Sequence, residues 1–134
     1  MYNFSFAQNI DMEQLVLLDN DSTSTIFCDK DYINNIRPAK YPLYLNTNGG
    51  QLFTTYICDI PNLGTHWFNE KAITNVISLA DITKHYRVTM DTDKEKAMTI
   101  HLPDNPEKFI EMKNGLYARL SNYLNNKTTT EFIT

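Results

Sequence analysis

Two carboxylates follow directly after the most aliphatic run of the sequence. Residues 15–18 read Leu-Val-Leu-Leu and are followed by five polar residues: Asp19, Asn20, Asp21, Ser22 and Thr23. This pattern predicts a buried strand that delivers an aspartate into a loop of small hydrogen-bonding residues. When two carboxyl groups held in this way face each other, they share one proton and activate a water molecule. The alternative is that Asp19 and Asp21 are ordinary turn residues.

Two metal-dependent interpretations fit the same residues less well. Four aliphatic residues followed by Asp-x-Asp-x-Thr resemble the first motif of haloacid-dehalogenase-type phosphatases, where the first Asp attacks phosphorus and the second is an acid and base near Mg²⁺. Those enzymes resemble doubly wound α/β domains and need a later acidic pair, which we do not find downstream. An EF-hand loop that began at Asp19 would place Lys30 where a bidentate Glu is required. The three histidines are scattered, so we expect no metal and no cofactor.

Short strands are predicted to position this loop. Alternating aromatic residues predict a strand over 2–6, and β-branched residues predict extended structure over 24–28. Residues 43–45 and 52–57 flank the Asn- and Gly-rich residues 46–51, which is typical of a hairpin. Further predicted elements are a helical turn at 31–35, a loop at 61–70, strands at 73–77, 86–90, 97–102 and 108–112, and a helix at 78–85 with Ser78 as its N-cap. We therefore expect a mostly β fold, a small closed barrel or sandwich with one short helix in the C-terminal half.

Composition limits the function classes. The chain has 134 residues, room for one domain, which we place at 1–120 with a polar tail or linker at 121–134. Twelve basic against sixteen acidic residues give a formal charge of −4, and no basic cluster points to nucleic acid. No apolar run is long enough to cross a membrane, and the start of the chain lacks a secretory pattern, so we expect a cytoplasmic protein. Cys28 and Cys58 are interpreted as buried thiols and not a disulfide.

Several segments together resemble one protease family. They are LLDNDSTSTIFC, LNTNGGQ, WFNEKAITNVISLADI, HYRVTMDT and GLY, in that order over residues 14 to 118. The combination resembles the retropepsin-like aspartic protease domain of copia-type LTR retrotransposon polyproteins, particularly those of algae and other protists. In that family a strand carries Asp-Ser-Gly or Asp-Thr-Gly, a Gly-rich hairpin forms a flap over the substrate, and a segment of the type Asn-h-h-Gly/Ser (h, hydrophobic) precedes a helix.

The resemblance implies a role for each segment. Asp19 would supply one catalytic carboxyl, paired with Asp19 of a second copy, and Asn20, Asp21, Ser22 and Thr23 would form the active-site loop. The flap would be the hairpin tip, with Asn48, Gly49 and Gly50 over an extended peptide. The segment behind the active site would comprise Asn75, Val76, Ile77 and Ser78. The implied protein is a homodimeric endopeptidase that processes its own Gag-Pol polyprotein inside the cell or within virus-like particles.

The chain also departs from the family at two positions of the loop. Asp21 stands where the family carries Gly, and Asn20 stands where it carries Ser or Thr. A second carboxylate close to Asp19 would raise the pKa of Asp19 through like-charge proximity, or its Cβ would crowd the dimer axis. The alternative hypothesis is therefore a catalytically inactive retropepsin-fold module for dimerisation or interaction.

Overall fold

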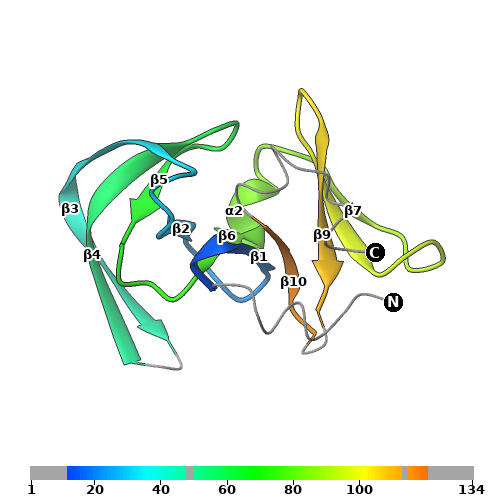
Figure 1. Ribbon diagram of the computed structural model, residues 1–134, viewed down its shortest axis with the longest axis horizontal. Helices are drawn as coiled ribbons and strands as arrows, with labels where there is room; N and C mark the ends of the chain where they lie inside the picture. Colours follow the sequence, from blue (N-terminus) through cyan, green and yellow to red (C-terminus); the bar gives the residue numbers. More distant parts are fainter. Residues whose placement is uncertain (1–11, 48–49, 113–114, 121–134) are drawn as a thin grey trace.

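The computed structural model describes residues 12–47, 50–112 and 115–120, and these form one mixed sheet of ten strands. The strand order is β3-β4-β5-β2-β6-β1-β10-β9-β8-β7 (Figure 1). The strands are β1 (Leu15–Asp19), β2 (Ile26–Phe27), β3 (Asn34–Thr47), β4 (Gly50–Ile60), β5 (Gly64–Phe68), β6 (Asn75–Ser78), β7 (Val88–Met90), β8 (Ala97–His101), β9 (Pro106–Glu111) and β10 (Tyr117–Leu120). The helices of the described chain are a 3₁₀ turn, η1 (Met12–Gln14), and a short α-helix, α2 (Leu79–Ile82).

The predicted mostly β class with one short helix is confirmed, but the predicted closed barrel is wrong. Strands β3 and β7 are the two ends of the sheet order, and no pairing between them closes the sheet in the described chain. Figure 1 shows the β3–β4 hairpin on one side of the molecule and β7 and β9 on the other. A local sequence pattern predicts strands but not the long-range pairing that opens or closes a sheet, so this part of the prediction had no physical basis in the pattern.

Strand β1 lies near the middle of the sheet because it is apolar on both faces. It pairs in parallel with β6 and antiparallel with β10. Val16 and Leu18 are almost fully buried in the core, together with Phe27, Ile77 and Phe109. A central strand flanked on both sides is expected to read as a continuous aliphatic run, as residues 15–18 do.

The hairpin of residues 43–57 is confirmed, and it is longer than predicted. Strands β3 and β4 pair in antiparallel register from Asn34↔Asp59 to Thr47↔Gly50, and the register shifts where β3 has extra residues, between Asn34 and Arg37 and between Pro38 and Leu43.

The predicted helix at 78–85 is confirmed in its first turn: the Ser78 side chain accepts a hydrogen bond from the amide of Asp81 as an N-cap. Residues 2–6, 121–134, Asn48 and Gly49 lie outside the described residues.

Two predictions of local structure are wrong. The segment 61–70 was predicted as a loop but contains β5, which pairs with both β4 and β2. The helical turn predicted at 31–35 is a short turn closed by Tyr32 N–H on Asp29 O, after which β3 begins. None of the helices in the described part of the chain has the length and hydropathy that crossing a membrane requires.

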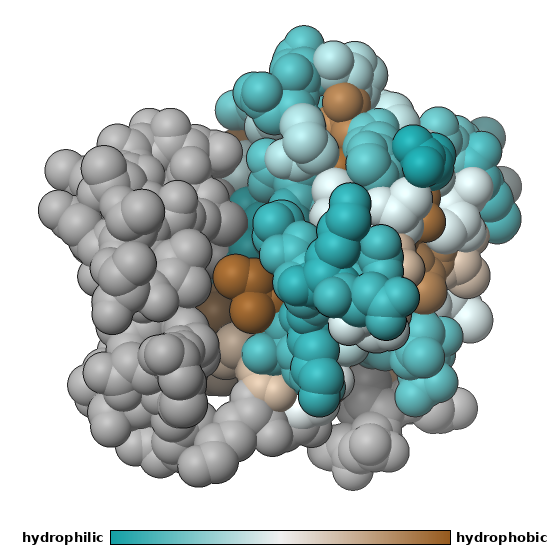
Figure 2. All heavy atoms as spheres, turned by 90° about the vertical axis from the view of Figure 1, so that its right-hand side faces the viewer, coloured by the Kyte–Doolittle hydropathy of each residue, from teal (hydrophilic) through white to brown (hydrophobic). Residues whose placement is uncertain are grey.

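The far end of the sheet presents a polar surface. Among the described residues that are visible on the side carrying β7 and β9, most are hydrophilic, with hydrophobic residues between them (Figure 2). Its strands follow one another as antiparallel neighbours, β7 with β8 and β8 with β9. The aspartate loop lies nearer the middle of the sheet, where β1 and β6 end.

Candidate active site

The aspartate loop begins where two parallel strands end together. Asp19 is the last residue of β1 and is the register partner of Ser78, the last residue of β6. Because β10 runs in the opposite direction, its first residue, Tyr117, lies beside Leu18. Asp19 therefore stands at an edge where β1 ends, α2 begins after β6, and β10 starts.

The carboxylate of Asp19 is held by its own loop. Its Oδ1 accepts a hydrogen bond from the backbone N–H of Asp21 at 2.8 Å. This is the turn geometry that aspartate forms with the amide two residues on. The Asp19 side chain is half-buried, whereas that of Asp21 is exposed. The loop amide thus orients the Asp19 carboxylate, and the side chain of Asp21 lies at the surface.

Ser78 fixes the middle of the loop from behind. Its Oγ donates to the carbonyl oxygen of Ser22 at 2.7 Å, and its backbone N–H donates to Thr25 Oγ1 at 3.0 Å. Ser78 and Thr25 are both buried. Within the loop, Ser22 Oγ donates to the carbonyl of Ser24 at 2.8 Å. Hydrogen bonds in a buried or partly buried setting are costly to break, so these three stabilise the loop.

Asn75 joins β6 to the segments on both of its sides. Its Oδ1 accepts from the amides of Cys28 and Asp29, and its Nδ2 donates to the carbonyls of Glu13 and Leu15. The side chain is fully buried, so these four contacts use all the hydrogen bonds that its amide group offers with its two donors and two lone pairs. Asn75 therefore ties the start of β1 to the end of β2.

The two hydrophobic residues between Asn75 and Ser78 lie beside β1. Ile77 pairs with Leu18 and is almost fully buried, while Val76 pairs with Leu17 and is half-buried. All four residues of this segment therefore contact the aspartate strand or its loop.

Other predicted site residues are not brought to Asp19. The side chains of Asn20 and Thr23 are exposed, so the bracing expected of the loop comes from Ser22 within it and from Ser78 and Thr25. Gly50 begins β4 with a φ of 121°, a conformation that favours glycine. Three strands separate β4 from β1 in the sheet order, so strand pairing does not place the hairpin next to Asp19.

Sequence reasoning missed Thr25 and the clamping role of Asn75. Thr25 reads as one more β-branched residue of an extended segment. Asn75 carries a recognisable signal, because an amide in the middle of the apolar run 73–77 must find buried partners. No group of three or more His, Cys, Asp or Glu within the described ranges is placed to hold a metal ion.

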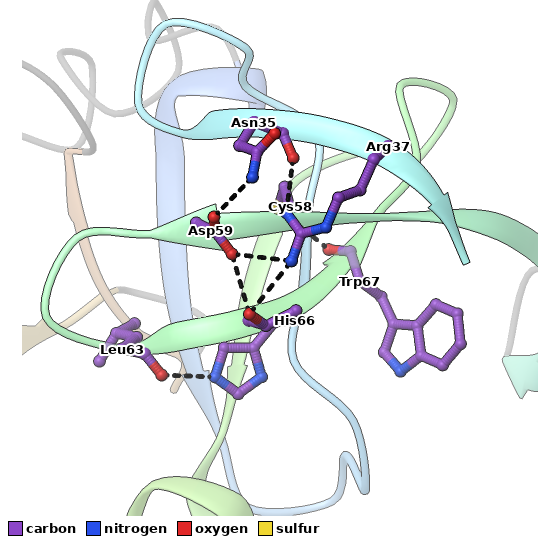
Figure 3. A network of polar contacts seen from close by, with 8 residues as sticks. Asn35, Arg37, Cys58, Asp59, Leu63, His66 and Trp67 are labelled. Atoms are coloured by element: carbon purple, nitrogen blue, oxygen red, sulfur yellow. Dashed lines mark hydrogen bonds and ion pairs between the residues drawn. The ribbon is translucent and has the colours of Figure 1, made fainter. Parts of the chain in front are cut away.

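A second polar network lies on β3, β4 and β5, centred on Asp59 (Figure 3). Its carboxylate accepts from Asn35 Nδ2 at 3.1 Å, from Thr65 Oγ1 at 2.8 Å and from Arg37 Nη2 at 3.2 Å. The hydrogen bonds from Asn35, Thr65 and Arg37 lower the pKa of Asp59 below its ordinary value.

Burial raises the pKa of the neighbouring Cys58 thiol to about 11. Cys28 and Cys58 are both buried thiols outside any disulfide, as predicted.

Comparison of the chain with protein-family models, with curated proteins and with solved structures found no match.

Proposed function

We propose that the protein is a retropepsin-like aspartic endopeptidase domain that contributes one Asp19 to an active site shared by two copies. The observation that carries this proposal is the position and support of Asp19. It ends a buried strand, its Oδ1 is oriented by a loop amide, and the loop is fixed from behind by Ser78. The resemblance of the sequence to copia-type polyproteins makes a Gag-Pol polyprotein the proposed substrate.

The chemistry follows from pairing two such carboxyls. At hydrogen-bonding distance two carboxyl groups share one proton, since like charges that close do not both ionise. The ionised carboxyl removes a proton from a water molecule, whose oxygen attacks the carbonyl carbon of the peptide bond. The protonated carboxyl donates its proton to the substrate, and the C–N bond breaks as the amine leaves with a proton.

The sheet favours this proposal over a phosphatase. A doubly wound phosphatase domain requires a parallel sheet with helices on both faces. Here the described strands pair in parallel only at β1–β6 and β2–β5, and the other seven pairings are antiparallel.

An inactive interaction module is the second candidate. The observation that favours it is Asp21, whose Cβ and charge occupy the loop position where the family carries Gly. This candidate expects the same fold and the same dimer without cleavage. The two candidates therefore differ in activity and in the proximity of the two Asp19 carboxyls.

The test is cleavage of a peptide library by the purified chain between acidic and neutral pH, read by mass spectrometry. We expect cleavage that pepstatin inhibits and that Asp19→Asn abolishes. Asp104→Asn is the matched control, because Asp104 is an exposed carboxylate in the β8–β9 turn. Equal cleavage by wild type and Asp19→Asn contradicts the proposal. A dimer that cleaves no peptide supports the interaction module instead.

A further inference from the structure

The imidazole ring of His66 lies between a carbonyl oxygen and a carboxylate. His66 is on β5, and its Nε2 lies 2.9 Å from the carbonyl oxygen of Leu63 (Figure 3). Its Nδ1 lies 3.4 Å from Oδ2 of Asp81, in the first turn of α2. The side chains of His66 and Asp81 are 17% and 28% exposed, so both are largely shielded from water. The ring therefore links the β4–β5 turn to the helix that follows β6.

This arrangement favours the protonated ring. A neutral imidazole has one N–H donor and one nitrogen lone pair, whereas an imidazolium has two donors. With its proton on Nε2, a neutral His66 donates to Leu63 but turns a lone pair toward the Asp81 carboxylate. With its proton on Nδ1, it turns a lone pair toward the Leu63 carbonyl oxygen. Each neutral form thus has one repulsive contact, and the imidazolium has none.

The other titratable groups around the ring do not oppose its positive charge. Cys58, the register partner of His66 on β4, has a buried thiol whose pKa is raised to about 11, so it stays neutral. Asp59 is the register partner of Thr65, lies on the opposite face and pairs with Arg37. Strand β2 and the turn residues 61–64 contain no titratable side chain. The titratable residues that follow α2 are Lys84 and His85, both exposed, and Tyr86.

A second contact joins the same two segments without a charge. The Tyr86 hydroxyl donates to the carbonyl oxygen of Asn62 at 2.6 Å, and the Tyr86 amide donates to the carbonyl of Ile82, the last residue of α2. The β4–β5 turn is therefore attached to α2 at its first turn by His66 and just beyond its end by Tyr86. A tyrosine hydroxyl does not ionise near neutral pH, so this second contact is an internal reference for the first.

We propose that His66 is a proton-operated clamp on α2, closed when the ring is protonated and open when it is neutral. The closed clamp holds Asp81 and so the start of α2, which the Ser78 hydroxyl connects to the carbonyl of Ser22 in the aspartate loop. When the ring loses its proton, its contact with Asp81 becomes repulsive, and the Tyr86 contact alone remains. The proposal does not depend on whether Asp19 is catalytic.

The direction of the pH dependence follows from this contact. Because the clamp favours the imidazolium, the folded chain binds this proton more strongly than the unfolded chain does. The stabilisation is therefore present in mildly acidic solution and is lost as the pH rises. Histidine charges ordinarily change between about pH 5 and pH 8, and carboxylates are ionised there, so the clamp works across this range.

The test is urea denaturation of the full chain at about pH 6 and about pH 8. Asp81→Asn should raise the unfolding equilibrium constant about fivefold at the lower pH and far less at the higher pH, and His66→Gln should do the same. Tyr86→Phe should raise it by the same factor at both. His85→Gln is the matched control, because His85 is exposed, and should leave the pH dependence of the wild type unchanged.

Imidazole ¹⁵N NMR reads the ring directly. We expect His66 to keep both protons to a higher pH in the wild type than in Asp81→Asn, and exchange of the Asp81 amide to become faster as this proton is lost. The clamp is overturned if His66 loses its proton at the same pH in both proteins, or if Asp81→Asn changes the unfolding constant by the same factor at both pH values. Either result would leave His66 as a structural histidine that donates to Leu63.

Discussion

The Ser78 hydroxyl donates a hydrogen bond to the carbonyl oxygen of Ser22, at an Oγ–O distance of 2.7 Å across 56 residues of sequence. The same Oγ accepts from the amide of Asp81 at 3.1 Å and so caps α2. One hydroxyl group therefore joins the aspartate loop to the start of the helix. The stability of the loop and that of the helix are coupled through this side chain.

Ser78→Ala should destabilise the protein and loosen the aspartate loop. Loss of the N-cap and of the bond to Ser22 should lower the free energy of unfolding by about 2 kcal/mol, measured by urea denaturation. Hydrogen exchange at the Asp21 amide, which bonds to Asp19, should become faster. Thr83→Ala is the control: its exposed hydroxyl contacts α2 alone, so we expect a change below about 0.5 kcal/mol. If Ser78→Ala and Thr83→Ala lowered the free energy of unfolding equally, the aspartate loop and α2 would not be coupled through the Ser78 hydroxyl.

Much of the surroundings of Asp19 could be predicted from local sequence. The aliphatic run 15–18 predicted a strand, and the observed β1 extends one residue further, to Asp19. The turn chemistry of residues 46–51 predicted the hairpin, and Ser78 predicted the start of α2. These features depend on residues that are close in the chain.

What was missed depends on partners that are distant in the chain. β5 contains Gly64, Thr65 and His66, which read as a loop, and it becomes a strand because β4 and β2 provide neighbours on both sides. β10 contains the buried Arg119, which contacts Glu107 at 3.0 Å and donates to the Tyr32 hydroxyl. A sequence pattern cannot show that a charged residue will find such partners.

Asn75 should be among the residues most sensitive to substitution in the described chain. Asn75→Leu keeps the approximate volume but leaves the amides of Cys28 and Asp29 and the carbonyls of Glu13 and Leu15 without this partner. The Leu15 carbonyl keeps the Thr74 hydroxyl as a donor, but the buried amide of Cys28 loses its Asn75 acceptor. Because losing a buried hydrogen-bond partner costs about 1–3 kcal/mol and Asn75 makes several such bonds, we expect a loss of about 3 kcal/mol by urea denaturation.

The control for Asn75 is Asn105→Ala, in an exposed turn, with an expected change within about 0.5 kcal/mol. Asn75→Asp should be intermediate at low pH, because its carboxyl oxygens still accept from the two amides. If Asn75→Leu were as stable as wild type, the four hydrogen bonds would have no net effect on folding.

Asp59 should contribute to stability above its folded pKa and lose that contribution in acid. Hydrogen bonds from Asn35, Thr65 and Arg37 lower the pKa of Asp59 in the folded chain. A group whose pKa is lower when folded stabilises the protein above the unfolded pKa, near 4, and this contribution is lost as the pH falls through the folded pKa. Thr65→Val removes one donor at nearly constant volume.

The measurement is a carboxyl ¹³C NMR titration of Asp59 in wild type and Thr65→Val. We expect the Asp59 pKa to be higher in the variant and the stability to depend less on pH in acid. Added salt should change the pKa little, because hydrogen bonds are the largest cause and the ionic attraction of Arg37 is smaller. An identical Asp59 titration in both proteins would mean that the Thr65 hydroxyl is not a donor to this carboxylate.

The Cys58 thiol should be chemically inert in the folded protein. Burial, with a smaller contribution from the charge of Asp59, raises the pKa of Cys58 to about 11. At pH 8 only about one thiol in a thousand would be ionised, and the thiolate is the reactive form. In a Cys28→Ala background, iodoacetamide should modify Cys58 far more slowly in the folded chain than in urea, at a rate that keeps rising with pH toward 11. Asp59→Asn should speed the reaction, because it removes the neighbouring negative charge that raises the Cys58 pKa. If the reaction rate instead levelled off at the pKa of an ordinary thiol, Cys58 would be open to water.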